Sequence, residues 1–136
     1  MEPETITILM ADDDEEDCFL AKEALSASGQ EAVLLTVEDG VELMEFLSVN
    51  PRPDIILLDL NMPRKDGREV LTEIRADASL SGIPVVILST SGEEEDISFS
   101  KGAGADLFLT KPPTFNEWVE IMGSLIVNSA GLKNLL

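Results

Sequence analysis

Three aspartates lie where two apolar segments end, and these carboxylates are the groups in the sequence best suited to chemistry. Asp12 and Asp13 follow the apolar run Ile6–Ala11, and Asp59 follows the run Ile55–Leu58. Two carboxylates about 4 Å apart repel by roughly 4 kcal/mol at an effective dielectric constant near 20. If the three side chains meet, they therefore require a bound proton or a cation. Carboxylate oxygens suit Mg²⁺, which keeps several waters and shares its coordination with phosphate oxygens.

Two further polar residues follow apolar runs in a similar way. Ser89 comes directly after Val85–Leu88, and Lys111 lies two residues after Leu107–Leu109. A carboxylate beside Mg²⁺ and a lysine ammonium, with a hydroxyl donor within reach, can accept a phosphoryl group, because the cations neutralise the charge on the transferred oxygens. These residue types favour phosphoryl transfer to an aspartate.

The elements that must position these residues are short strands and helices in alternation. The apolar runs are nearly continuous and rich in Val, Ile and Leu, which predicts strands buried on both faces of a parallel sheet. They cover Ile6–Ala11, Ala32–Val37, Ile55–Leu58, Val85–Leu88 and Leu107–Leu109. Helical spacing fills the intervals. The pattern is weakest over about Glu93–Ala103 and strongest over Phe115–Ile126, where Thr114 is the expected N-cap and Glu117 completes a capping box.

A strand and a helix repeated five times predict a three-layer, doubly wound α/β domain. We take the strand order 2-1-3-4-5 from known five-stranded folds of this kind, not from the sequence. In such sheets ligands bind outside the carboxyl ends of the strands where the strand order reverses, here between strands one and three. Asp12, Asp13 and Asp59 should then converge on one crevice, with Ser89 and Lys111 on its other side.

Composition excludes several classes of function. The chain has 136 residues, 27 acidic and 9 basic, and a formal charge of −18, which argues against nucleic acid or an anionic membrane as a direct partner. The absence of histidine removes catalytic triads and His-ligated zinc. Cys18 is the single cysteine, so an internal disulfide is excluded. With no apolar run of membrane-spanning length and no signal peptide at the start, a single cytoplasmic domain is expected.

The chain resembles the receiver domains of two-component response regulators over about residues 5–127, with 128–136 as a C-terminal tail. Four motifs in register carry the resemblance, although each alone is weak. They are Asp12-Asp13, Asp59-Leu60-Asn61-Met62-Pro63 with Asp66-Gly67, Pro84 through Ser89, and Lys111-Pro112. The stretch Asp59 to Leu71 looks most like the phytochrome-associated, single-domain subgroup. The fold implied is flavodoxin-like, with the five-stranded sheet described above.

The resemblance implies a role for each residue of the crevice. Asp59 would be the phosphoacceptor, and Mg²⁺ would be held by Asp13, Asp59 and the backbone carbonyl of Asn61, with Asp12 acting through water. The resemblance also assigns three residues around the phosphoryl group, namely Lys111 as its cationic partner, Ser89 as the switch hydroxyl and Phe108 as the aromatic switch position. The Lys111–Pro112 bond is often cis in the family.

The resemblance also implies partners. The phosphoryl donor would be a phosphohistidine on a sensor histidine kinase or a histidine phosphotransfer protein. The chain would not be an enzyme with its own substrate, and no output domain is expected because the receiver-like region fills the sequence. Signalling would run through protein contacts, made by the face of helix four, strand five and helix five, or the chain would serve as a phosphoryl shuttle or sink. The same face could form a homodimer.

Three departures from the family pattern carry expectations of their own. Phe108 stands where many relatives have tyrosine, so an inward-turned ring would be stabilised by burial alone. The bulk of Thr90 should narrow access to the site. The acidic run Asp14–Asp17 should strengthen cation binding and slow the approach of anionic small-molecule phosphodonors.

Other interpretations stay open at this stage. Taken singly, Asp12–Asp17 is typical of a helix N-terminus, Lys111 before two prolines of a loop, and Phe108 of a core residue. A flavodoxin-like flavin binder is disfavoured by aspartates that would repel the flavin phosphate. An aspartyl-phosphate phosphatase of the Asp-x-Asp type would need a carboxylate where Asn61 stands. A receiver-like domain that binds partners without being phosphorylated remains a third alternative.

Overall fold

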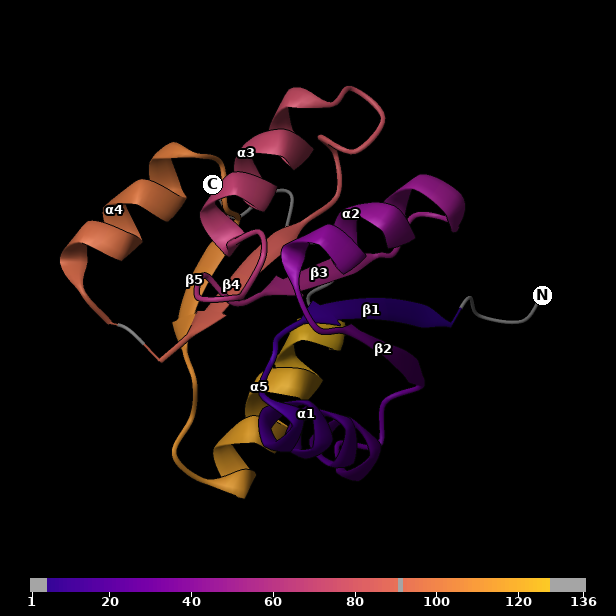
Figure 1. The fold of residues 1–136 in the computed structure, drawn as a ribbon. Coiled ribbons are helices and arrows are strands. Elements are labelled where there is room, and N and C mark those ends of the chain that lie inside the picture. Colours follow the sequence, from indigo (N-terminus) through magenta and orange to yellow (C-terminus); the bar gives the residue numbers. More distant parts are fainter. Residues whose placement is uncertain (1–4, 91, 128–136) are drawn as a thin grey trace.

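Five strands and five helices alternate along the described part of the chain (Figure 1). The computed structural model describes residues 5–90 and 92–127. The strands are β1 (Ile6–Ala11), β2 (Ala32–Val37), β3 (Ile55–Leu58), β4 (Val85–Ser89) and β5 (Leu107–Thr110). The helices are α1 (Glu15–Ala27), α2 (Gly40–Val49), α3 (Gly67–Ala76), α4 (Glu94–Gly102) and α5 (Phe115–Val127). The expected alternation is confirmed, including the weakly patterned fourth helix.

The strands form one parallel sheet in the order β2-β1-β3-β4-β5. Helices α2, α3 and α4 cover one face of the sheet, and α1 and α5 cover the other (Figure 1). Each face has its own apolar core, one built with α2 and α3 and the other with α1 and α5. The predicted three-layer, doubly wound fold and its strand order are both confirmed. The order reverses between β1 and β3, so their carboxyl ends form the expected crevice.

Burial distinguishes the central strands from the edge strands. Every residue of β3 and β4 is buried, as is most of β1. Edge strand β2 instead leaves Val33 45% and Leu35 37% exposed, and edge strand β5 is half-buried. The prediction that all five strands are buried on both faces is therefore wrong for the two edges. An apolar run does not distinguish a central strand from an edge strand, because position in the sheet decides how many neighbours cover it.

Polar side chains fix where the helices begin. Thr114 is the N-cap of α5, since its Oγ1 accepts the backbone N–H of Glu117 at 3.2 Å. The carboxylates of Asp14, Asp39 and Asp66 accept backbone N–H groups at the starts of α1, α2 and α3. The acidic run after β1 thus contains a helix cap, Asp14, directly behind the two aspartates of the crevice. The helix-start interpretation of this run is confirmed for Asp14.

In the described ranges, no helix is long and apolar enough to cross a membrane. The expectations for the tail 128–136 lie outside the described residues.

Candidate functional site

The three predicted aspartates meet at the carboxyl ends of β1 and β3. One carboxylate oxygen from each of Asp12, Asp13 and Asp59 lies within 4.8 Å of the other two. Asp12 and Asp59 are buried, whereas Asp13 is exposed. Backbone hydrogen bonds continue the sheet to this point, because Asp12 N–H donates to Val37 O at 3.0 Å and Asp59 N–H to Ala11 O at 3.0 Å. The sheet itself therefore brings together side chains that are far apart in sequence.

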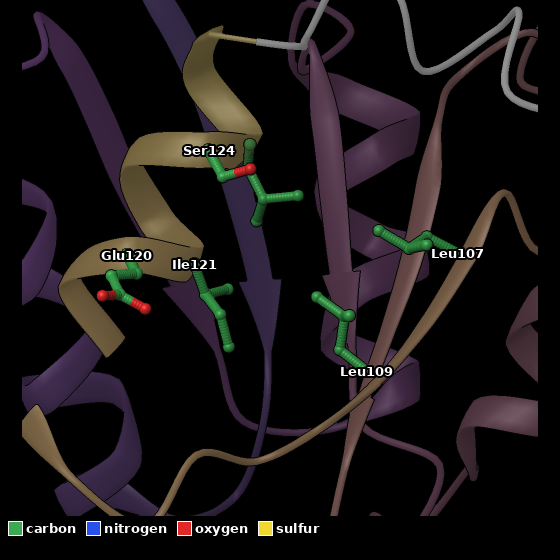
Figure 2. A pocket seen from close by; sticks show the side chains of 6 residues that line it. Leu107, Leu109, Glu120, Ile121 and Ser124 are labelled. Atoms are coloured by element: carbon green, nitrogen blue, oxygen red, sulfur yellow. The ribbon is translucent and has the colours of Figure 1, made fainter. Parts of the chain in front are cut away.

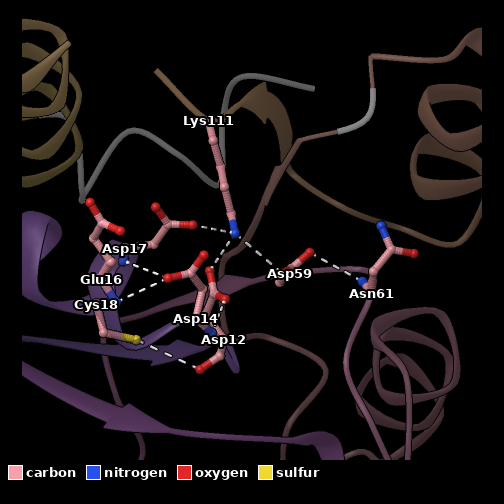
Figure 3. Close-up of polar contacts among 8 residues, drawn as sticks. All are labelled: Asp12, Asp14, Glu16, Asp17, Cys18, Asp59, Asn61 and Lys111. Carbon is pink, nitrogen blue, oxygen red and sulfur yellow. Dashed lines mark hydrogen bonds and ion pairs between the residues drawn. The ribbon is translucent and has the colours of Figure 1, made fainter. Parts of the chain in front are cut away.

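The loops fix one oxygen of each buried carboxylate. Oδ1 of Asp12 accepts the backbone N–H of Asp14 at 2.9 Å, and Oδ1 of Asp59 accepts the backbone N–H of Asn61 at 3.1 Å. These are Asx turns, in which the side chain bonds the backbone two residues on. The other oxygen, Oδ2 in both residues, is left to face Lys111 (Figure 3).

Lys111 places its ammonium group among three carboxylates. Nζ lies 2.7 Å from Oδ2 of Asp17, 2.8 Å from Oδ2 of Asp12 and 3.3 Å from Oδ2 of Asp59 (Figure 3). Burial alone would lower the pKa of Lys111, but the carboxylates of Asp12 and Asp17 raise it above its usual value. The amine is therefore a permanent cation at neutral pH. Its backbone N–H donates to Ser89 O at 2.8 Å, which ties β5 to the end of β4.

No peptide bond among the described residues is cis, so the Lys111–Pro112 bond is trans. The cis form suggested by the resemblance is not present here.

Asp12 is a buried carboxylate with a shifted pKa. Burial raises its pKa to about 6, and Lys111 only partly offsets this effect. Although its Oδ2 lies within ion-pair distance of Nζ, the contact lacks hydrogen-bond geometry, and this buried oxygen accepts no hydrogen bond from the residues that the structure describes. A buried acceptor without a donor, beside two more carboxylates, is a donor set that fits a hard divalent cation such as Mg²⁺.

The remaining predicted site residues lie nearby but differ in what the structure shows of them. Ser89 is fully buried at the end of β4, opposite Thr110 of β5. Phe108 is half-buried on β5 and packs against the core that contains α2 and α3. Asn61 is exposed, and its described link to the site is the backbone N–H given to Asp59. Their functional roles therefore stay predictions.

Two residues at the site were missed by sequence reasoning. Asp17 was placed within an acidic run, yet it makes the shortest contact to Lys111 across 94 positions of sequence. The sequence signal for this contact is its spacing, because Asp17 follows Asp13 by about one helical turn. Gly67 was quoted only as part of a motif. A Cβ atom there would lie 2.3 Å from the carbonyl oxygen of Asp59, so α3 can begin against the crevice only with glycine.

Two other observations concern residues around the crevice. Cys18 is half-buried, with its Sγ 3.7 Å from the carbonyl oxygen of Asp12, and burial raises the pKa of its thiol to about 12. The thiol is therefore protonated at neutral pH. In the first turn of α4, the half-buried Asp96 forms an ion pair with Arg68 at 2.5 Å. This pair joins the start of α4 to α3.

Comparison with known proteins agrees with this geometry. Residues 8–122 match the family described as the response regulator receiver domain. The response regulator Rcp1 of Synechocystis sp. is 43% identical over 110 residues, covering 76% of this chain and 75% of that protein.

Two solved structures are similar over nearly their whole length. The phosphorylated cyanobacterial phytochrome response regulator RcpA has 38% identity and a TM-score of 0.86, covering 93% of this chain and 95% of that chain. The Mn²⁺-bound form of response regulator Rcp1 has 37% identity and a TM-score of 0.81, covering 93% of this chain and 94% of that chain.

Proposed function

Because the chain belongs to the response regulator receiver domain family, we propose that Asp59 accepts a phosphoryl group from a phosphohistidine on a sensor histidine kinase or a histidine phosphotransfer protein. The observation that carries this proposal is the convergence of Asp12, Asp13 and Asp59 at one sheet edge, beside the buried ammonium of Lys111. The similarity to a phosphorylated regulator, RcpA, supports it further. The chain then acts as a phosphoacceptor switch and not as an enzyme with its own substrate.

The transfer step follows from the chemistry of Asp59. A carboxylate oxygen attacks phosphorus and forms a P–O bond, while the P–N bond to the donor imidazole breaks and its electron pair leaves with the nitrogen. Lys111, at 3.3 Å from Asp59, is placed to balance the negative charge of the phosphoryl oxygens. Ser89 is buried at the end of the adjacent strand β4, and its hydroxyl is proposed to donate a hydrogen bond to the same phosphoryl group. Phe108 is proposed as the side chain whose packing changes with it.

Mg²⁺ is the proposed cofactor. Asp13, Asp59 and the backbone carbonyl of Asn61 would hold it, with Asp12 acting through water, and the bound cation would neutralise charge on the phosphoryl oxygens. The buried, undonated Oδ2 of Asp12 and the carboxylate cluster support a divalent cation at this position. The Mn²⁺-bound form of Rcp1 is consistent with it.

For the output, we propose protein contacts through α4, β5 and α5. Helix α4 leaves Ile97 37% and Phe99 39% exposed. A groove of about 300 Å³ runs between β5 and α5 (Figure 2). Leucines and an isoleucine line most of it, together with one acidic and one hydroxyl side chain: Leu107, Leu109, Glu120, Ile121, Ser124 and Leu125. A downstream protein or a second copy of the chain would bind here, in the cytoplasm.

The proposal is tested by incubating the chain with Mg²⁺ and acetyl phosphate or a phosphorylated histidine kinase, and then measuring bound phosphate. We expect labelling of the wild type, no labelling of Asp59→Asn, and wild-type labelling of the exposed control Glu69→Gln. Omission of Mg²⁺ should abolish labelling. Labelling that persists in Asp59→Asn would contradict the assignment. An unlabelled wild type that still binds its partners would favour a receiver domain that works without phosphorylation.

A further inference from the structure

Nζ of Lys111 is already surrounded by three carboxylates, and those of Asp17 and Asp59 accept its hydrogen bonds. An ammonium group carries three N–H donors. The described carboxylates around Nζ belong to Asp17 at 2.7 Å, Asp12 at 2.8 Å and Asp59 at 3.3 Å (Figure 3). Under the proposed function, a phosphoryl oxygen on Asp59 must also bind Nζ. The phosphoryl oxygen would then compete with the three carboxylates for the single positive charge of Nζ, and the contact that is released most easily should lengthen.

Asp17 is the partner that Lys111 can release most easily. The Asp17 side chain is 19% exposed, compared with 1% for Asp12 and 8% for Asp59. A released carboxylate must be rehydrated, and this is far less costly at the edge of the crevice than inside it. Asp59 also stays in place because it carries the phosphoryl group. Asp17, on the first turn of α1, is the remaining candidate.

We infer that Asp17 is a positioning residue that competes with the phosphoryl group for Lys111, an inference that rests on the proposed function. In the unmodified chain Asp17 draws the ammonium away from Asp59, whose contact is the longest of the three. This leaves more negative charge on Asp12 and Asp59 for a cation. The same contact lowers the affinity of the crevice for an anion, because it occupies the positive charge that the anion needs.

Loss of Asp17 should therefore have two effects of opposite sign. Lys111 would turn fully to Asp12 and Asp59, so binding of Mg²⁺ would weaken and binding of an anionic phosphoryl analogue would strengthen. A structural role for Asp17 in α1 would weaken both. Glu16 provides the matched control, because it is an exposed acid on the same turn and its removal changes the net charge equally.

The experiment measures two dissociation constants for the full chain by calorimetry or ¹⁹F NMR. One is for Mg²⁺ alone, and the other is for beryllium trifluoride at saturating Mg²⁺. The variants are Asp17→Asn, which keeps the side-chain shape, Asp17→Ala, which also removes the acceptor, and Glu16→Gln. We expect both Asp17 variants to bind beryllium trifluoride about tenfold more tightly than the Glu16→Gln control. We also expect both to bind Mg²⁺ more weakly than this control.

Asp17 variants that bind beryllium trifluoride no more tightly than Glu16→Gln would overturn the inference while leaving the proposed function intact. Failure of the wild type to bind beryllium trifluoride at saturating Mg²⁺ would instead contradict both the proposed function and the inference. The two failures are thus distinguishable within one set of titrations.

Discussion

The charge balance of the crevice predicts that one of its residues lowers stability when no cation is bound. Asp13 places a carboxylate oxygen within 4.8 Å of those of Asp12 and Asp59, whereas the described contacts of Lys111 are with other carboxylates. At an effective dielectric constant near 20, each such pair repels by about 3 kcal/mol. Because Asp13 is exposed and Lys111 offsets part of the field, we discount the sum to about 1 kcal/mol.

Asp13→Asn should therefore raise the free energy of unfolding in EDTA by about 1 kcal/mol, which for a chain of this length is about 3 °C in Tm. Mg²⁺ should act in the opposite sense. At ten times its dissociation constant, the cation should stabilise the wild type by about 1.4 kcal/mol, and most of this gain should be absent in the variant.

Urea and thermal denaturation with and without Mg²⁺ measure both effects. The control is Glu23→Gln, which removes one exposed negative charge of α1 outside the aspartate cluster. An Asp13→Asn variant less stable than the wild type in EDTA would refute the reasoning. So would one that responds to Mg²⁺ as the wild type does.

Three further perturbations follow from the same structure. Gly67→Ala should lower the free energy of unfolding in urea by at least about 2 kcal/mol, because the added Cβ would overlap backbone atoms 2.3–3.0 Å away. The control Gly102→Ala has open space around it and should change this free energy by less than about 0.5 kcal/mol. Equal effects of the two substitutions would contradict the prediction. Because the pKa of Asp12 is raised to about 6, calorimetry should show Mg²⁺ affinity falling up to about tenfold per unit as pH drops below 6, and a flat profile would count against the shift. Without cation, the same raised pKa contributes stability that is present below about pH 4 and is lost as the pH rises through 6. Arg75→Met should lower the free energy of unfolding by about 3 kcal/mol, because it removes the guanidinium that lies 2.9 Å from the largely buried carboxylate of Asp106. The affinity for Mg²⁺ should stay unchanged, and an altered affinity in a stably folded variant would contradict this prediction.

The sequence predicted the fold closely because strand and helix signals were local and strong. The runs Ile6–Ala11, Ala32–Val37 and Ile55–Leu58 match the observed strands residue for residue, and the fourth and fifth strands extend one residue further than expected. The strand order came from known folds, because pairing between strands leaves no local signal. Exposure of β2 was missed for the same reason.

The site was predictable as far as the ends of strands determine it. In a parallel sheet, residues that follow neighbouring strands must meet, so the convergence of Asp12, Asp13 and Asp59 followed from topology. The contact of Asp17 with Lys111 did not, since it depends on how α1 turns after its cap and on the reach of a long side chain. The partly buried ion pair of Arg68 with Asp96 depends likewise on how α3 packs against α4.

The most direct test of the central claim is to identify the phosphorylated residue by chemical conversion. After incubation with Mg²⁺ and a phosphodonor, borohydride reduces an aspartyl phosphate to homoserine, and peptide mass spectrometry locates the converted residue. The account predicts homoserine at position 59, dependent on Mg²⁺ and absent without the donor. Conversion at another aspartate, or none in a chain that binds Mg²⁺ and the donor, would contradict it.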